Sequence, residues 1–350
     1  MHKKQKIIAA VLASLTGFSA VAITSTVMVY DACFPRFERP DYAVYPGIYT
    51  YERIKDSLNR EEFTFPSGEV SLKGYYYPSD NAKGILVLAH GFHAGADDYL
   101  PIIEYFVNHS YSVFTYNVRA TYESEGENQV GMCQSLVDID NALKYIKNTP
   151  KYSSMPIFLL GHSWGGYAVT SVLALHPDVK ACAAIAPMYS GYDIMVEKAE
   201  QYVGKLAVMP KPIFNVYQKI LFGDYIKYNG VVGINTPNIP VLIAHGIDDK
   251  IITYDAQSIV SHKDEITNPN VVYYTGYGIH GDHNNIWHST DSAIYQMEIA
   301  DRLKRMEIEK GDTLSYEEKC EFYKTVDHRL YSEVNHELMD KILELFNNQI

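Results

Sequence analysis

The chain has 350 residues, of which 47% are hydrophobic and 21% are charged. It is long enough to bury a large core, which excludes a disordered tail and a small disulfide scaffold. The 42 acidic residues outnumber the 30 basic ones, and the net charge of −12 argues against binding to nucleic acid. The cysteines lack C-x-x-C spacing, so neither a structural zinc site nor a disulfide framework is indicated. They are Cys33, Cys133, Cys182 and Cys320.

Residues 1–30 are interpreted as an N-terminal membrane anchor. The run from Ile7 to Tyr30 contains no charged side chain, and as a helix it would be long enough to cross a hydrocarbon core of about 30 Å. Lysines 3, 4 and 6 precede the run, which predicts a cytoplasmic N-terminus and a remaining chain outside the cell membrane. The alternative is a cleaved signal peptide with small residues at 20–22, which would make the protein secreted, but the run is longer than a normal signal-peptide core.

Residues 31–58 are rich in Pro, Tyr and charge and are interpreted as a connector to a domain over residues 59–350. Two runs on either side of Pro66-Ser67-Gly68 predict an antiparallel hairpin, Glu61–Phe65 and Val70–Tyr77. Further strands are predicted at Gly84–Ala89, Ser112–Tyr116, Pro156–Leu160, Val179–Ala186, Pro240–Ala244 and Asn270–Thr275. Helices are predicted at Asp97–Asn108, Gln134–Lys147, Gly165–Leu175, near Asp255–His262, at Asn285 to about Ile308 and at Tyr316–Asn348. This alternation predicts an α/β fold with a mostly parallel, doubly wound sheet and helices on both faces.

The alternation is interrupted at about residues 188–238. We interpret this stretch as a helical lid insertion that covers the site, although a surface excursion without a role is the alternative. Its apolar and aromatic side chains favour an acyl or aromatic substrate group, or else they pack the insertion onto the core. They include Tyr192, Met195, Tyr202, Phe214, Tyr217 and Phe222.

The clearest chemical motif is Gly161-His162-Ser163-Trp164-Gly165, which matches G-x-S-x-G between a predicted strand and a predicted helix. A serine on such a sharp turn projects its hydroxyl above the sheet, and the small residues beside it let strand and helix approach each other. Ser163 is therefore the predicted nucleophile. A helix-capping role would explain the serine but not the flanking glycines.

A serine nucleophile needs a histidine base and a carboxylate that orients it, arriving in the order Ser, Asp, His. Asp248 and Asp249 follow the strand that ends at Ala244, and successive side chains point apart, so only one of them can hold the imidazole. The histidine candidates after the last strand are His280 and His283, whereas His288 is expected inside the following helix.

The same histidines, together with His90 and His93, could instead be metal ligands of a hydrolase. That hypothesis would leave the G-x-S-x-G motif unexplained, so no metal and no other cofactor is expected.

Negative charge that develops on a substrate oxygen needs backbone N–H donors fixed beforehand. The strand ending at Ala89 continues into His90-Gly91-Phe92, where glycine permits a tight turn. The backbone N–H groups of Phe92 and Trp164 are the expected oxyanion hole.

Together these motifs resemble the α/β-hydrolase superfamily over roughly residues 60–305. The motifs in family order are HGF at 90–92, SEG at 124–126, GHSWGG at 161–166, HGIDD at 245–249 and His-Asn at 283–284. The chain looks most like membrane-anchored or extracytoplasmic bacterial serine hydrolases of the Bem46-like and serine aminopeptidase-like branch. In that branch the acid falls three residues after the glycine of H-G-x-x-D, which selects Asp249, and the histidine precedes Asn or Asp, which selects His283. Asp282 departs from the usual glycine and keeps His280 open.

The resemblance implies hydrolysis of an ester, thioester or amide through an acyl-enzyme and does not choose among these substrates. Our expectation is a carboxylic ester rather than a peptide. An acyltransferase with the same triad and a non-catalytic binding protein on the same fold are the alternatives. The expected partners are a small acyl substrate and, through the N-terminal segment, the membrane.

Overall fold

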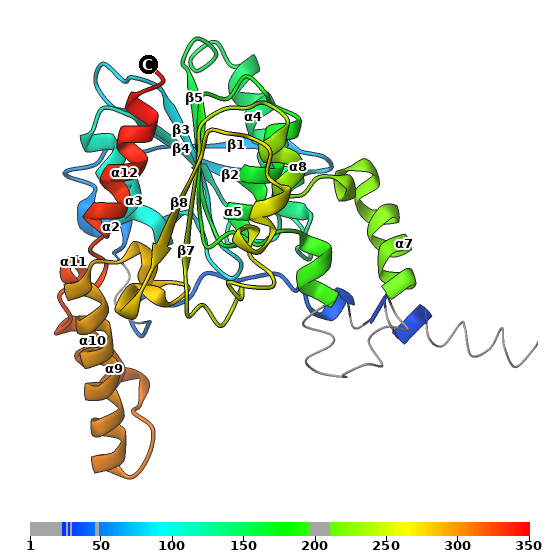
Figure 1. The fold of residues 1–350 in the computed structure, drawn as a ribbon. Helices are drawn as coiled ribbons and strands as arrows, with labels where there is room; N and C mark the ends of the chain where they lie inside the picture. The colour runs from blue at the N-terminus through cyan, green and yellow to red at the C-terminus, as the bar shows by residue number, and fades with distance from the viewer. Residues whose placement is uncertain (1–22, 26, 29, 46–48, 197–210) are drawn as a thin grey trace, which may run out of the picture.

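The computed structural model describes residues 23–25, 27–28, 30–45, 49–196 and 211–350. The predicted sheet is present, and Figure 1 shows it at the centre of the molecule. Its strands are β1 Glu61–Ser67, β2 Val70–Tyr77, β3 Ile85–Ala89, β4 Ser112–Tyr116, β5 Ile157–His162, β6 Ala181–Ile185, β7 Val241–Gly246 and β8 Val271–Gly276. Their spatial order is β1-β2-β4-β3-β5-β6-β7-β8. β2 pairs antiparallel with both β1 and β4, and the strands from β4 to β8 are all parallel. The mostly parallel α/β prediction is therefore confirmed.

Helices cover both faces of the sheet. One face packs against α4 Gln134–Asn148, α5 Trp164–Ser171 and α8 Gly230–Asn235. The other face packs against α3 Leu100–Asn108 and α12 His336–Asn347. Since the central strands are buried on both sides, they consist of continuous apolar runs, such as Ile85-Leu86-Val87-Leu88-Ala89 in β3.

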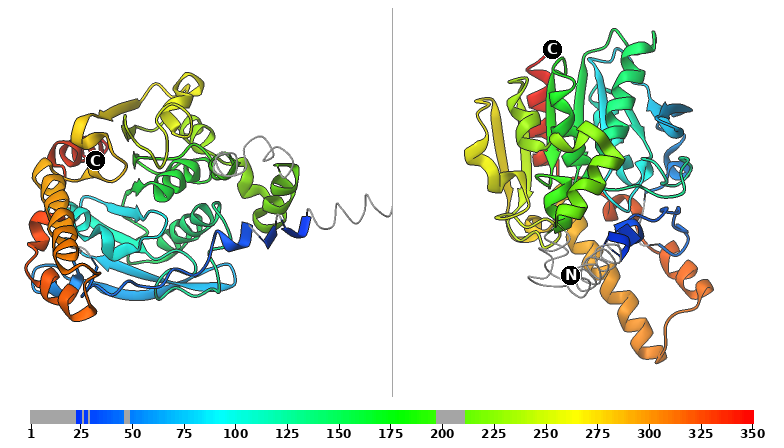
Figure 2. Two further views of the ribbon diagram at one scale, coloured as in Figure 1. Left: turned by 90° about the horizontal axis from the view of Figure 1, so that it is seen from below. Right: turned by 90° about the vertical axis from the view of Figure 1, so that its right-hand side faces the viewer.

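The remaining elements are short or lie at the periphery. They are α2 Tyr51–Ile54, α7 Lys211–Phe222, α9 Thr290–Lys310, α10 Tyr316–Lys324, α11 His328–Tyr331 and the 3-10 turns η1 Ala96–Tyr99, η2 Val172–Ala174, η4 Gly223–Lys227, η5 Ile259–Glu265, η6 Gly278–Gly281 and η7 Asn285–Trp287. Helices α9 and α10 extend away from the sheet, on the side of the molecule opposite α7 (Figure 2).

One prediction near the C-terminus is wrong because the structure starts the next helix at a capping residue. His288 does not lie inside a helix: it forms an isolated bridge with Val334, and the next helix begins only after Ser289, whose hydroxyl accepts a hydrogen bond from Ser292 N. The stretch predicted to be helical over 316–348 contains three helices, α10, α11 and α12, because Asp327 and Asn335 each cap a new helix start.

The region between β6 and β7 departs from the alternation, as the sequence pattern suggests. Residues 191–196 are helical, and α7, η4 and α8 follow before β7. The described end of the apolar N-terminal run lies beside α7, and the Tyr30 ring is 5.8 Å from Phe214 and 5.4 Å from Tyr217 (Figures 1 and 2).

Within the described ranges, no helix combines the length and the apolar character that crossing a bilayer requires. The anchor predicted at residues 1–30 falls largely outside these ranges and stays a prediction.

Candidate active site

Ser163 occupies the sharp turn between β5 and α5. Its φ of 57° and ψ of −116° lie in a region that disfavours residues with a side chain, so the backbone is strained there. The flanking glycines make the turn possible: a Cβ on Gly161 would lie 2.3 Å from Gly165 O, and a Cβ on Gly165 would lie 2.0 Å from Ala89 O. The turn is fixed by a 2.8 Å hydrogen bond from Ser163 N to Ile185 O. This is the geometry that exposes a serine hydroxyl above a sheet.

Asp249 and His283 are brought together from the loops after β7 and β8. The His283 Nδ1 atom lies 2.6 Å from Asp249 Oδ2, and the Asp249 carboxylate is fully buried. Its other oxygen, Oδ1, accepts hydrogen bonds from Ile251 N at 2.8 Å and Ile252 N at 2.9 Å. The carboxylate is thus fixed in orientation, with one oxygen left for the imidazole.

Asp249 also contacts a second histidine. His245 Nε2 lies 3.1 Å from Asp249 Oδ2 and 2.9 Å from Ile252 O. Burial opposes ionisation of Asp249, but hydrogen bonds from His245, His283 and the Ile252 amide hold the pKa of this carboxyl well below its usual range. Asp249 is therefore ionised at neutral pH, and a neutral His283 carries its proton on Nδ1, where it faces this carboxylate.

The alternative residues are placed elsewhere. Asp248 is exposed, and its backbone N–H donates to Gly281 O. His280 contacts Asn285 O, in the segment that directly follows it, and Thr290 Oγ1, at the start of α9. His288 is buried, and burial lowers its pKa to about 4. Across the described residues, no group of three or more His, Cys, Asp or Glu side chains is placed to hold a metal ion.

The turn at His90-Gly91-Phe92, which we call the oxyanion turn after its predicted role, is held in place by the His90 side chain. Its Nε2 accepts a hydrogen bond from Val118 N at 3.0 Å, so the proton lies on Nδ1, which donates to Gly91 O at 2.8 Å. Burial lowers the pKa of His90 to about 4 and keeps this ring neutral. Because C=O and N–H of a trans peptide point in opposite directions, holding Gly91 O turns the Phe92 N–H to the other side.

Both predicted oxyanion residues belong to segments that adjoin Ser163. Trp164 directly follows Ser163 and opens α5, where backbone N–H groups have no acceptor inside the helix. A Cβ added to Gly91 would lie 3.5 Å from Ser163 Cβ, so the turn before Phe92 runs alongside the serine. The Phe92 and Trp164 rings meet edge to face with centroids 5.2 Å apart.

An apolar wall continues from Phe92 to the N-terminal segment and α7. Tyr30, Phe34 and Phe214 form its buried centre. The partly buried side chains packed around this centre are Phe92, Met132, Tyr192, Met195, Tyr217 and Leu221. Of the aromatic residues that the sequence analysis assigned to the insertion, Phe222 is buried, and Tyr202 lies outside the described residues.

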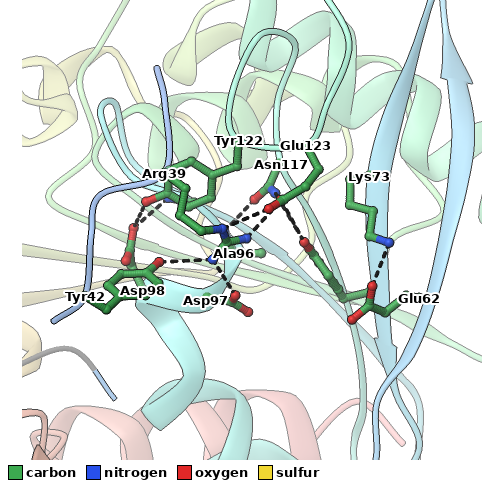
Figure 3. A network of polar contacts seen from close by, with 12 residues as sticks. Arg39, Tyr42, Glu62, Lys73, Ala96, Asp97, Asp98, Asn117, Tyr122 and Glu123 are labelled. Atoms are coloured by element: carbon green, nitrogen blue, oxygen red, sulfur yellow. Dashed lines mark hydrogen bonds and ion pairs between the residues drawn. The ribbon is translucent and has the colours of Figure 1, made fainter. Parts of the chain in front are cut away.

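Residues 30–45 are fastened beside the oxyanion turn by an ion-pair network (Figure 3). Arg39 contacts Asp97 at 2.8 Å and Glu123 at 2.8 Å, and its guanidinium lies over the Tyr122 ring. Phe37 stacks on His93 with ring centroids 5.0 Å apart. Phe37 and Arg39 therefore hold this part of the chain against the domain, next to His93.

Sequence reasoning missed the supporting roles of His90, His162, His245 and Arg39. His90 and His245 each stand in a His-Gly pair directly after a strand, and His162 directly precedes Ser163. Those positions are a usable signal, because side chains at strand ends in such sheets converge on one edge. Arg39 offers no such signal, since its partners lie 58 and 84 residues away.

Part of the chain matches a protein-family model and curated proteins. A family model described as serine aminopeptidase, S33, matches residues 80–234, which include Ser163 and the oxyanion turn but not Asp249 or His283. A polyketide transferase, grgF, from Penicillium sp. is 28% identical over 130 residues, 36% of this chain and 44% of that protein. Protein phosphatase methylesterase 1 from Candida albicans is 25% identical over 128 residues, 37% of this chain and 35% of that protein. The chain thus spans less than half the length of these curated relatives.

Among solved structures, the Pyrococcus furiosus esterase Pf2001 superposes with a TM-score of 0.54 at 18% identity. The match covers 77% of this chain and 98% of the esterase. A likeness at this level of identity supports the fold over most of the domain, beyond the range of the family model.

Proposed function

Because the chain belongs to the α/β-hydrolase superfamily, we propose that it is a serine hydrolase that cleaves a carboxylic ester through an acyl-enzyme on Ser163. The observation that carries the proposal is the buried 2.6 Å contact between His283 Nδ1 and Asp249, on the loops that follow the nucleophile in family order. A protein that only binds ligands has no need for a histidine oriented by a buried carboxylate together with a serine on a strained turn.

In the proposed mechanism, His283 Nε2 takes the Ser163 hydroxyl proton as the oxygen attacks the substrate carbonyl carbon. The N–H groups of Phe92 and Trp164 stabilise the resulting oxyanion. The C–O bond to the alcohol then breaks, and the proton passes from His283 to the leaving oxygen. Water repeats the sequence on the acyl-enzyme and releases the acid, so the reaction requires no cofactor.

The apolar wall of Tyr30, Phe34 and Phe214, continuous with Phe92, supports an apolar acyl group as the substrate class. Burial of each methylene of an acyl chain against such a wall contributes about 0.8 kcal/mol. Thioesters would fit the same site, and a carboxylic ester remains the preferred substrate over an amide.

A second candidate is acyl transfer, favoured by the likeness to a polyketide transferase. It would use the same Ser163 acyl-enzyme, with an alcohol in place of water as the acceptor. The two activities differ only in the product.

The test is fluorophosphonate labelling of the purified chain with intact mass and peptide mapping, followed by turnover of p-nitrophenyl esters. We expect one label per chain on Ser163, and a higher kcat/KM for the butyrate and octanoate esters than for the acetate. Added glycerol or methanol would yield a new ester in the case of acyl transfer, and only free acid in the case of hydrolysis. A folded protein that takes no label would contradict both enzymatic candidates and favour the binding protein.

We also propose that the apolar run ending at Tyr30 anchors the catalytic domain at the outer face of a cell membrane. Tyr30 is buried against α7, and the exposed side chains of α7 include Val216 and Ile220, so a bilayer that holds this run would lie close to α7. We expect the full chain to stay in the membrane pellet after carbonate treatment and to be released by detergent, whereas a chain starting at Ile23 is soluble. Full-length protein in the carbonate supernatant would contradict anchoring, and an N-terminus beyond residue 22 would indicate cleavage.

A further inference from the structure

Tyr99 and His162 connect the oxyanion turn to the loop that carries His283. The Tyr99 hydroxyl accepts a hydrogen bond from Gly91 N at 2.9 Å and lies 2.8 Å from His162 Nδ1. His162 Nε2 lies 3.1 Å from the His283 carbonyl oxygen. Tyr99 and His162 are both buried, and neither belongs to the proposed Ser-His-Asp set.

The hydrogen-bond partners of Tyr99 and His162 determine where each proton lies. A carbonyl oxygen can only accept, so the His162 proton must lie on Nε2 and is donated to His283 O. The neutral His162 Nδ1 therefore accepts, and the Tyr99 hydroxyl donates to it. Burial, together with the nearby His283, lowers the pKa of His162 to about 3, so the ring keeps this single tautomer at neutral pH.

The neutral state of His162 matters because its ring lies beside the proposed base. The His162 and His283 ring centroids are 5.0 Å apart. His283 must become positively charged during the reaction, and a second cation at this distance would disfavour that charge. A neutral histidine at position 162 supports the main chain of His283 without opposing its protonation.

The same hydrogen bonds connect the three segments that carry the proposed nucleophile, oxyanion hole and base, whose distances from one another control the rate of the reaction. His162 directly precedes Ser163, Gly91 directly precedes Phe92, and His283 lies in an irregular turn between η6 and η7. Asp249 holds only the imidazole of His283, whereas His162 holds its backbone. The Tyr99 ring stacks on Trp287 at 5.8 Å, which fixes it from the other side.

We propose that Tyr99 and His162 are positioning residues that hold the oxyanion turn, the nucleophile and the His283 loop in register through one directed hydrogen-bond chain. The inference rests on the hydrolysis proposed above. A displacement of about 1 Å among reacting groups can reduce the rate about 100-fold, so small movements in this chain have large kinetic effects.

The first test compares Tyr99→Phe with Tyr116→Phe in the full-length protein. Tyr99→Phe keeps the ring on Trp287 but leaves Gly91 N–H and His162 Nδ1 without their partner. Tyr116 is the matched control, since it is equally buried and its hydroxyl has no hydrogen-bond partner in the described part of the chain. With p-nitrophenyl butyrate we expect kcat to fall about 10- to 100-fold in Tyr99→Phe, with KM within about twofold, and both constants within about twofold in Tyr116→Phe.

The second test uses His162→Gln and His162→Leu. Glutamine can still donate a hydrogen bond to His283 O and accept one from Tyr99, whereas leucine can do neither, so we expect His162→Gln to retain at least tenfold more kcat. This pair of His162 variants also tests the proposal if Tyr99→Phe fails to fold. A readout independent of turnover is the downfield NMR signal of the His283 Nδ1 proton, whose exchange with water should be faster in Tyr99→Phe than in Tyr116→Phe.

The outcomes separate the two proposals. If the wild-type protein labels on Ser163 but Tyr99→Phe keeps the wild-type kcat and proton exchange, the positioning role is overturned while the hydrolase proposal stands. The positioning role is equally overturned if the loss of activity follows only the unfolded fraction or appears only in KM. A wild-type protein that never labels overturns the hydrolase proposal, and the positioning inference with it.

Discussion

Replacement of Ser163 by alanine should abolish fluorophosphonate labelling and lower kcat/KM for p-nitrophenyl butyrate by about 10⁵-fold or more. The reason is that the remaining groups can still bind the substrate and stabilise an oxyanion, but no acyl-enzyme can form. Ester turnover measured with an equally folded Ser163→Ala protein checks this expectation. Residual turnover near the wild-type rate would mean that another group acts as the nucleophile.

The same position should also show a stability effect that depends on the strained backbone. At a φ of 57° and a ψ of −116°, any Cβ is unfavourable, and only glycine adopts this conformation without strain. We therefore expect Ser163→Gly to be as inactive as Ser163→Ala but more stable than it by about 1 kcal/mol in urea unfolding, after allowance for the greater chain entropy of glycine. Equal stability of the two variants would indicate that the turn relaxes without a serine.

Replacement of Asp249 by asparagine should lower kcat by about 10⁴-fold with little change in folding. The Asp249 Oδ1 atom accepts hydrogen bonds from Ile251 N and Ile252 N, so the asparagine oxygen will take that place and its NH₂ group will face His283. An N–H donor in that position moves the imidazole proton from Nδ1 to Nε2. His283 then has no free Nε2 lone pair with which to accept the Ser163 proton.

Asp248→Asn is the matched control, because it makes the same change one residue earlier on an exposed side chain. We expect its kcat to stay within about threefold of the wild-type value. Equal losses in the two variants would mean that the turn as a whole, rather than the Asp249 carboxylate, supports the reaction.

Since the pKa of Asp249 is held well below its usual range, activity lost on acidification from pH 7 to 5 should come from groups other than this carboxyl.

The sequence was most informative where structure and chemistry are determined by neighbouring residues. The alternation of apolar strands with amphipathic helices determined the sheet, because each strand buried on both faces must be apolar throughout. Gly161 and Gly165 identified Ser163 as the residue at the tip of a sharp turn, since only glycine allows such a close approach of strand and helix. These features involve contacts within a few residues or a repeated local pattern.

Capping residues were present in the sequence but were outweighed by the apolar periodicity around them. Asp327 and Asn335 each accept hydrogen bonds from a helix start, which divides the predicted helical stretch at the C-terminus into three helices. Ser289 likewise places His288 before α9 rather than inside it. Whether such a residue caps a new helix or lies within a longer one depends on the tertiary contacts of the segments around it.

The residue pattern alone left adjacent or nearby candidates of the same type open. The family resemblance favoured Asp249 and His283, and the tertiary structure brings these two side chains into contact. Asp248 and Asp249 carry the same functional group, and the turn after β7 directs Asp249 inward and leaves Asp248 exposed. His280 and His283 are separated by two residues, yet of these two only His283 contacts the Asp249 carboxylate, which is 34 residues away in sequence. The contact of His162 with His283 spans 121 residues. Contacts at such separations depend on how strands are ordered in the sheet, and the residue pattern along the chain does not contain that order.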